Sequence, residues 1–266
     1  MRIKQFILFC ISYSCAFVLH AASIALIIDD MGNSRVDEAA FDLPAAITFA
    51  ILPHTPFSEE FAARSAAQDR EVMLHMPMES LAGNNPGPGT ITSTMQPELI
   101  TQKLQYALAN IPNAIGINNH MGSKLTQLTL PMTTTMAFLR KHGLFFVDSR
   151  TTRYSKAEKI AQKQGVMAWH RNVFIDHTLN TEQMNIQLQR LVRIARKYRQ
   201  AVGIAHPHPA TLKFLQQHLP QLREAGIELI PVSQVFEYRA DSLLLARQQD
   251  GEKESPEPVQ LAPDGQ

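Results

Sequence analysis

Cysteine is nearly absent from this sequence, which contains only Cys10 and Cys15. Both lie in an N-terminal segment that we expect to be removed from the mature chain. A protein without cysteine cannot form a disulfide, bind a metal through a thiolate or use a cysteine nucleophile. The chemistry of the mature protein must therefore depend on other side chains.

An excess of charge of either sign is also absent. The 266 residues include 25 lysines and arginines and 24 aspartates and glutamates, for a formal net charge of +1. A nearly neutral chain gives no support for binding through a strongly basic surface, so we expect no nucleic-acid partner. With 45% hydrophobic and 18% charged residues, the composition is typical of one large globular domain.

The N-terminal apolar run is short for a membrane span, which needs about 20 apolar residues. It covers residues 6–19, follows Arg2 and Lys4, and precedes small residues at 21–23. A basic start, a short apolar run and a small-residue exit are typical of a secretory signal peptide. We therefore predict a signal peptide at residues 1–22 and a periplasmic or secreted protein. An uncleaved membrane anchor is the alternative.

Short aliphatic segments alternate with amphipathic stretches through the rest of the chain. The expected strands are residues 24–28, 46–51, 71–76, 114–117, 144–147, 173–175, 201–205 and 228–230. Strands this short and aliphatic are typical of parallel strands buried on both faces. Expected helices begin near Ser58, Pro97, Thr181 and Pro209. The alternation predicts an α/β fold, a distorted (β/α) barrel of about seven parallel strands with helices outside.

Two segments stand outside this alternation. Residues 81–94 are rich in glycine, proline and asparagine, and we expect them to form a loop over one end of the barrel. From residue 248 onward the chain is polar and contains proline, which predicts a disordered tail. The predicted organisation is a signal peptide at 1–22, one domain at 23–247 and a tail at 248–266.

Polar side chains follow several of the expected strands at the point where each strand ends. The carboxyl ends of barrel strands meet at one mouth, so we expect these side chains to be neighbours. Imidazole and carboxylate ligands around an open position suit a divalent ion, most of all Zn²⁺. Such an ion polarises a carbonyl and lowers the pKa of bound water, whose proton a nearby carboxylate can take. The residues are Asp29, Asp30, His75, Glu79, Asn118, Asn119, His120, Asp148, Arg150, Asp176, His177, His206 and His208.

Some of these residues also have a simple structural explanation. An ion pair between Asp148 and Arg150 that steadies the rim is as plausible as a catalytic role for them. We interpret Asp176 and His177 as a turn, because aspartate commonly forms one after a strand. The basic residues between positions 190 and 199 are interpreted as the solvated face of a helix.

Several segments together resemble a known family. IALIIDDMG resembles the first motif of polysaccharide deacetylases, LHMPME resembles their second motif more loosely, and AHPHP resembles their late histidine motif. With FAILP, INNHMGS and FVDSRT, the ordered set resembles the divergent branch of this NodB-like superfamily over residues 24–236. The resemblance implies a metal-dependent hydrolase that removes N-acetyl groups from a cell-envelope polysaccharide or its fragments.

The resemblance also implies roles for individual residues. Asp29 matches the family's general base, while Asp30 and His75 match metal ligands. The second histidine of the second motif is replaced by Glu79, so either Glu79 or His120 completes the metal site. We favour His120, because a neutral imidazole preserves the charge of the site.

The late motif and the departures from the family pattern leave alternatives open. His206 or His208 matches the histidine that assists the leaving group, and the sequence does not choose between them. Because a metal-ligand histidine and an Arg-Pro motif are missing, a non-catalytic carbohydrate-binding or envelope-scaffold protein is the second hypothesis. Hydrolysis of another amide or ester is the third. The expected partners are a polysaccharide or oligosaccharide and envelope proteins.

Overall fold

The computed structural model describes residues 21–236, which form one sheet of nine strands. Their order is β6-β5-β4-β3-β2-β1-β8-β7, with β9 paired to β1, and the pairings are parallel. Apart from Ala21 and Ala22, the predicted signal peptide lies outside the described residues, as does the predicted tail. The strands are β1 (Ala22–Met31), β2 (Thr48–Ile51), β3 (Val72–Met78), β4 (Ala114–Met121), β5 (Phe145–Asp148), β6 (Ala168–His170), β7 (Val173–Phe174), β8 (Gln200–Ala205) and β9 (Ile227–Ile230).

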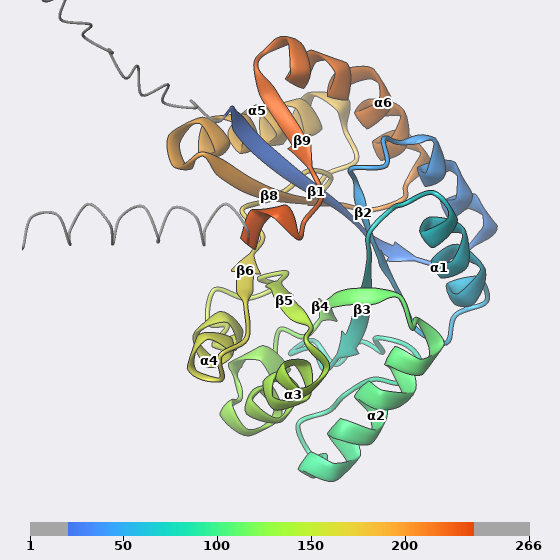
Figure 1. Cartoon of the computed structure of the whole chain (residues 1–266), viewed down its shortest axis with the longest axis vertical. Helices are drawn as coiled ribbons and strands as arrows, with labels where there is room; N and C mark the ends of the chain where they lie inside the picture. Colours follow the sequence, from blue (N-terminus) through green and yellow to red (C-terminus); the bar gives the residue numbers. More distant parts are fainter. Residues whose placement is uncertain (1–20, 237–266) are drawn as a thin grey trace, which may run out of the picture.

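β6 and β7 connect the two ends of this sheet. Only Arg171 and Asn172 separate them, and β6 pairs with β5 while β7 pairs with β8. The Asn172 N–H donates to the Val202 carbonyl at 2.8 Å, and the Asn172 Oδ1 accepts from the Val202 N–H at 2.7 Å. The Asn172 side-chain oxygen thus takes the place of a backbone carbonyl at the point where the chain passes from β6, which pairs with β5, to β7, which pairs with β8. The sheet curls into a distorted barrel, as the sequence predicts (Figure 1).

The number of strands differs from the expected seven. Eight of the nine strands overlap segments that the sequence predicts, and β6 is the one it misses. Ala168, Trp169 and His170 contain no aliphatic run, so hydrophobic patterning does not mark them as a buried strand. The segment also divides into two very short strands because each half pairs with a different neighbour.

Helices cover the outside of the curved sheet (Figure 1). Pro97 and Pro209 begin two of them, because a proline in the first turn leaves no intrahelical hydrogen bond unmade. Asn180 caps a third by accepting from the N–H of Glu182 at 2.9 Å. No helix within residues 21–236 has the length and apolar character needed to cross a membrane. The helices are η1 (Arg35–Asp42), α1 (Ser58–Ala67), α2 (Pro97–Asn110), η2 (Leu125–Gln127), α3 (Thr129–His142), α4 (Ala157–Lys163), α5 (Thr181–Tyr198) and α6 (Pro209–Glu224).

β1 runs through the centre of the molecule and is buried on both faces, which explains its unbroken apolar sequence. Ile24, Leu26 and Ile28 belong to the core between the sheet and the helices. Ala25 and Ile27 point the other way, into a second core inside the barrel. Two layers of packing therefore fix the direction of β1 and the position of the polar residues at its end.

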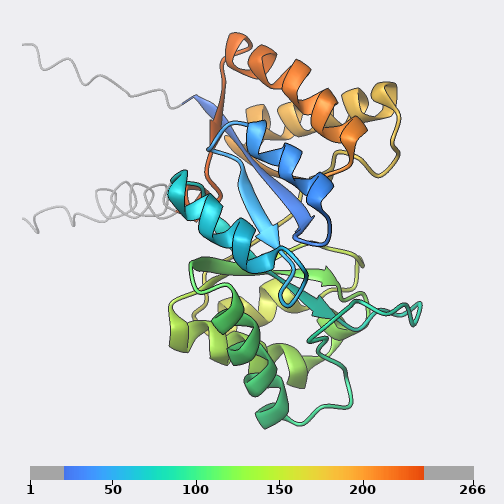
Figure 2. The same cartoon turned by 90° about the vertical axis from the view of Figure 1, so that its right-hand side faces the viewer.

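The carboxyl ends of the central strands lie on one side of the molecule. Figure 2 shows the arrowheads of β1 and β3 on the side where the segment between β3 and α2 projects. This segment contains the loop that the sequence predicts at residues 81–94. A single parallel bridge between Met78 and Ile91 ties it to the end of β3.

Candidate metal centre

Three side chains from separate strands converge at this side of the barrel. Asp30 follows the core of β1, His75 lies in β3 and His120 lies near the end of β4. The Asp30 Oδ1 is 3.0 Å from the His75 Nε2 and 2.7 Å from the His120 Nδ1, and the two nitrogens are 3.1 Å apart. The three atoms thus form a nearly equilateral triangle and can hold one metal ion.

The backbone of Asp30 is in an unusual conformation that directs its carboxylate. Its φ is 60°, in the left-handed region that non-glycine residues adopt at a cost of about 1–2 kcal/mol. The register between β1 and β2 shifts between Ile28 and Met31, so the pleat is interrupted at Asp29 and Asp30. Met121, directly after His120, has a φ of 54°. Backbone strain of this kind gathers at functional sites.

Hydrogen bonds fix which nitrogen of His75 faces the cluster. Asn118 donates from Nδ2 to the Asp29 Oδ1 at 2.7 Å, so its Oδ1 is the acceptor for the His75 Nδ1 at 2.8 Å. With Nδ1 protonated, a neutral His75 turns the lone pair of Nε2 toward the Asp30 carboxylate. A metal-binding histidine is commonly held by an oxygen partner in this way.

The geometry of the triangle fits a divalent ion. Ligand atoms about 2.0–2.1 Å from Zn²⁺ lie about 3.3 Å apart in a tetrahedral site. The buried Asp30 Oδ1 makes no well-formed hydrogen bond, although both nitrogens lie close to it. Short distances without hydrogen-bond geometry are expected when the lone pairs of the oxygen and the two nitrogens point at a common centre rather than at one another. Two imidazoles and one carboxylate also form a donor set that suits catalytic Zn²⁺.

Asp29 lies beside the triangle but is almost fully buried, with 2% of its surface exposed. Its Oδ2 is 3.8 Å from the His75 Nε2. Burial raises the pKa of Asp29, and this outweighs the nearby His75 and His206, which lower it. A carboxylate with a raised pKa is suited to accept a proton near neutral pH.

The pKa of Asp30 is shifted in the opposite direction. Burial alone would raise its pKa, but its contacts with His120 and His75 hold the pKa far below the usual range. Two adjacent carboxylates therefore have separate electrostatic characters, one suited to a proton and one to a cation.

His206 and Asp176 form a second group beside the triangle. The Asp176 Oδ1 lies 3.0 Å from the His206 Nδ1, and its Oδ2 accepts from the His206 N–H at 2.7 Å and from the Thr211 hydroxyl at 3.0 Å. The His206 Nε2 then lies 4.0 Å from the Asp30 Oδ2. Burial would lower the pKa of His206, but its contacts with Asp176 raise this pKa to about 9.

This arrangement corrects the interpretation of Asp176 as a simple turn residue. The register pairs Val173 with Gly203, which brings Asp176 level with His206 at the ends of β7 and β8. Sequence patterns do not reveal this relation, because β7 is only two residues long. His208 is exposed and has a ligand atom within 4.8 Å of those of Asp176 and His206. His177 is exposed as well.

Glu79 lies outside the triangle. It pairs with Lys124 at 2.6 Å and accepts from the Ser93 N–H at 2.6 Å, so it fastens the segment that follows β3. Burial acts to raise the pKa of Glu79, but the contacts with Lys124 and Ser93 lower it to about 2. Of the two residues considered for the place of the missing histidine, only His120 lies with Asp30 and His75.

Asp148 and Arg150 do not form the ion pair that the sequence analysis considered. The Arg150 guanidinium pairs with Glu158 at 3.1 Å, and only the Arg150 backbone N–H binds Asp148, at 2.8 Å. The Asp148 Oδ2 accepts from the Ser155 hydroxyl at 2.7 Å. Both residues therefore brace the turn after β5. Asn119 has a similar role, since its Oδ1 accepts from the Ser149 N–H at 3.0 Å.

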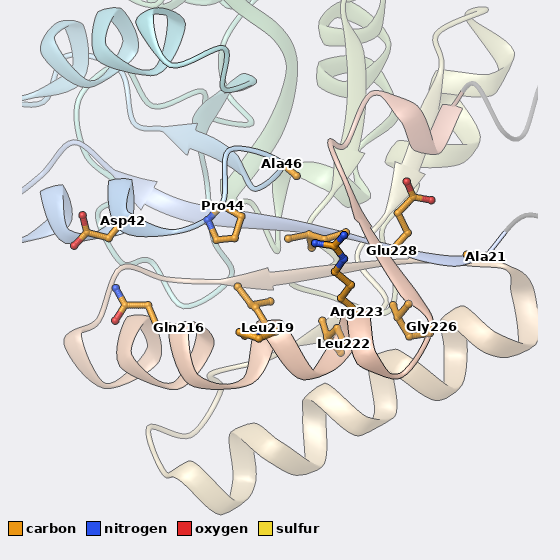
Figure 3. Close-up of a pocket in the computed structure, with 13 residues that line it drawn as sticks. Ala21, Asp42, Pro44, Ala46, Gln216, Leu219, Leu222, Arg223, Gly226 and Glu228 are labelled. Atoms are coloured by element: carbon orange, nitrogen blue, oxygen red, sulfur yellow. The ribbon is translucent and has the colours of Figure 1, made fainter.

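A cavity of about 930 Å³ lies at the opposite end of β1, away from these groups. Figure 3 shows Leu219, Leu222 and Arg223 of α6 facing Pro44 and Ala46 across it. The two clusters of possible metal ligands found among residues 21–236 contain none of its lining residues. This cavity is thus separate from the candidate centre, which lies at the carboxyl ends of the strands.

Comparison with known sequences relates most of the chain to one family. The model of the family described as divergent polysaccharide deacetylase matches residues 26–236. The uncharacterized protein YibQ of Escherichia coli K12 is 36% identical over 198 residues, which are 74% of this chain and 62% of that protein. An uncharacterized protein of Haemophilus influenzae is 33% identical over 235 residues, 88% of this chain and 84% of that protein. The chain thus spans less than two thirds of the length of the E. coli relative.

Solved structures share the fold at low sequence identity. The uncharacterized protein ATU2773 of Agrobacterium tumefaciens superposes with a TM-score of 0.78 at 23% identity, covering 81% of this chain and 89% of that chain. The Bc1960 peptidoglycan N-acetylglucosamine deacetylase gives 0.51 at 14%, covering 82% and 89%. BA3943 of Bacillus anthracis, a CE4 family pseudoenzyme, gives 0.50 at 15%, covering 81% and 66%. At these identities the likeness is one of fold.

Proposed function

The chain belongs to the divergent polysaccharide deacetylase family, and on this premise we propose that it is a metal-dependent hydrolase that removes N-acetyl groups from a cell-envelope glycan. The observation that carries the proposal is the triangle of Asp30, His75 and His120, with Asp29 and His206 beside it. A ligand set, a buried carboxylate and a histidine with a raised pKa supply the groups that amide hydrolysis requires.

Asp30, His75 and His120 are the proposed ligands, and Zn²⁺ is the proposed ion. When bound, such an ion polarises the acetamide carbonyl and lowers the pKa of a water molecule. His75 is held for this role through its Nδ1 contact with Asn118, which orients the imidazole. His120 keeps the site less negative than a second carboxylate would, which favours the attacking oxygen.

Asp29 is the proposed general base. Asn118 donates to its Oδ1 and leaves Oδ2 directed toward the His75 side of the triangle. Asp29 accepts the proton of the attacking water as the new carbon–oxygen bond forms. Its raised pKa brings its proton affinity closer to that of the water, which favours the transfer.

His206 is the proposed general acid. Asp176 holds its Nδ1 and keeps the ring protonated at neutral pH, with Nε2 directed toward the triangle. When the carbon–nitrogen bond breaks, His206 donates its Nε2 proton to the amine, and the products are acetate and a free amino sugar. His208 is exposed and does not share the direct contact that fixes His206, so we assign the acid role to His206.

The proposed substrate is supported by the family, and the proposed location by the N-terminal sequence. The polysaccharide deacetylase family acts on carbohydrates, and one structural neighbour is a peptidoglycan N-acetylglucosamine deacetylase. We propose an envelope glycan or its fragments as substrate, and a periplasmic or secreted enzyme, because of the signal peptide expected at residues 1–22.

Acetate release from peptidoglycan fragments and chitooligosaccharides tests this function. We expect Zn²⁺-loaded protein to release acetate and Asp29→Asn to reduce kcat by about 10²–10⁴-fold, as for loss of a general base. Asp69→Asn, the same substitution at an exposed position, should retain activity. Acetate release that survives both chelation and Asp29→Asn would rule out this mechanism.

Carbohydrate binding without turnover is the second candidate function. The chain lacks the family's Arg-Pro motif. Among the described residues, no arginine forms a hydrogen bond with Asp29, and both observations favour this function. One structural neighbour is itself a pseudoenzyme. Glycan binding with no acetate release under Zn²⁺, Mn²⁺, Co²⁺ or Ni²⁺ would establish this alternative, and robust release would exclude it.

A further inference from the structure

A small basic cavity lies beside the His206 side of the candidate centre. It measures about 240 Å³ and is lined by Arg171, Phe174, His177, Gln187 and Arg190, among others. Its residues come from the segment around β7 and from α5. The sequence predicts a solvated face for the basic residues of α5, but Arg190 shares this cavity with the half-buried Arg171.

Arg171 is held rigidly by two backbone carbonyls and an aromatic ring. Its Nε donates to the Ser149 carbonyl at 2.7 Å, its Nη2 donates to the Arg150 carbonyl at 2.9 Å, and its guanidinium lies 3.6 Å from the centre of the Phe174 ring. Burial lowers its pKa to about 10, so it remains cationic at neutral pH. Two carbonyl contacts leave further N–H groups available, since a guanidinium carries five donors.

The two charged residues that line the cavity, Arg171 and Arg190, are both cationic. Neither Arg171 nor Arg190 forms an ion pair within residues 21–236, whereas the neighbouring Arg150 pairs with Glu158. The lining residues include no carboxylate. Asp148 and Asp29 act on the charge of Arg171 from outside the cavity, so an anion inside it would be a further and direct partner for the two guanidinium groups.

The cavity is next to the groups that we assign to catalysis. The Phe174 ring stacks on the His206 ring, with 5.8 Å between their centres. His177 directly follows Asp176, which holds His206. A group bound in the cavity therefore lies beside His206, the proposed acid for the leaving group.

We propose that Arg171, Arg190 and His177 form a subsite for a carboxylate on the glycan, so that the preferred substrate is an acidic amino-sugar polymer. This inference rests on the proposed function and specifies its substrate class. A carboxylate matches the geometry, because its two oxygens accept parallel N–H bonds from a guanidinium. The cavity is large enough for such a substituent.

The test compares one N-acetylated oligosaccharide in two forms, with a free carboxylate and with the same carboxylate as its methyl ester. We expect kcat/KM for acetate release to be about tenfold higher for the free acid, as for a hydrogen-bonded charge pair at a partly exposed site. The preference should decrease at high ionic strength, because salt screens the attraction.

Arg190→Gln should remove most of the preference for the free acid. Arg193→Gln is the matched control, since it makes the same change on the same helix at an exposed residue outside the cavity. Arg190→Lys should restore part of the preference, because it restores the charge without the planar guanidinium.

The outcomes separate this inference from the proposed function. Equal kcat/KM for the two forms, or equal loss of preference in Arg190→Gln and Arg193→Gln, would overturn the subsite and leave the deacetylase proposal intact. If neither form releases acetate, the deacetylase proposal fails. The subsite is then tested by measuring the affinity of the protein for the two forms by calorimetry. Binding of the free acid that is about tenfold tighter than that of the ester, and that loses this difference in Arg190→Gln, supports the subsite. Tighter binding of a phosphate-bearing analogue would overturn the carboxylate assignment.

Discussion

At the residue scale, the adjacent carboxylates Asp29 and Asp30 have opposite properties because their surroundings differ. Asp29 is buried against Asn118, and burial raises its pKa. Asp30 adopts a positive φ and turns its carboxylate toward two imidazoles, which lower its pKa despite partial burial. Titratable groups whose pKa values are separated in this way are suited to separate roles in one reaction.

His206 and Asp176 give the first prediction. In metal-free protein, Asp176→Asn should lower the pKa of His206 from about 9 toward its ordinary value of 6.5, because the contact that raises it is weakened. NMR titration of the imidazole measures this pKa. Thr211→Val, which removes a different donor to Asp176, should move it much less. An unchanged pKa in Asp176→Asn would refute the pairing.

The pair of His206 and Asp176 makes the stability of the folded protein depend on pH. The folded-state pKa of His206 is raised, so its contribution is fully present below about pH 6.5 and is lost as the pH rises through about 9. Asp176 has a lowered pKa, because His206 outweighs burial, and its contribution is lost as the pH falls through that lowered value. Wild-type and Asp176→Asn protein should therefore become more alike in stability above about pH 9.

At the element scale, the short strands β6 and β7 decide whether the sheet closes. Each pairs with a different neighbour, and Asn172 carries the hydrogen bonds between them through both its backbone and its side chain. This segment also supplies Arg171 and leads to Asp176. The crossing from β5 to β8 therefore positions residues on both sides of the mouth.

Asn172→Ala gives a prediction for this element. Loss of the side-chain acceptor leaves the buried Val202 N–H without its partner, and we expect the free energy of unfolding to fall by about 1–3 kcal/mol. Urea denaturation measures the change. Asn33→Ala, an exposed asparagine, is the control and should shift the value by about 0.5 kcal/mol or less. Equal effects of the two substitutions would show that the Asn172 side chain does not support the closure.

At the scale of the whole molecule, the triangle joins strands that are distant in the chain. Asp30, His75 and His120 come from β1, β3 and β4: β3 and β4 pair with each other, whereas β1 pairs with β2, β8 and β9. An ion bound by all three residues would link these parts of the sheet. Binding to the folded state alone stabilises a protein by mass action.

Thermal unfolding with and without Zn²⁺ tests this link. At a free Zn²⁺ concentration one hundred times the Kd, we expect about 2.7 kcal/mol of stabilisation. For a domain of this size that corresponds to a Tm increase of about 5–10 °C. His120→Ala should lose most of the increase, whereas His142→Ala, on the outer helix α3, should keep it. An increase that persists in His120→Ala would place the bound ion elsewhere.

The fold was largely predictable from the sequence because hydrophobic patterning is local. Eight of the nine strands overlap segments expected from their aliphatic runs, and the prolines at the starts of α2 and α6 mark those helices directly. Only β6 lacks this signal, since Ala-Trp-His has no aliphatic pattern. The parallel barrel follows from the alternation, as strands buried on both faces need helices outside.

The residues of the candidate site were identifiable from the sequence, but their relations were not. Strand ends marked Asp29, Asp30, His75 and His120, because parallel strands bring their carboxyl ends to one edge. The contact of Asp176 with His206 depends on the register of a two-residue strand, and the basic cavity depends on how α5 packs beside it. The sequence thus determined which groups reach the mouth. The tertiary structure alone decided which of them touch, since register and helix packing arise from contacts between segments far apart in the chain.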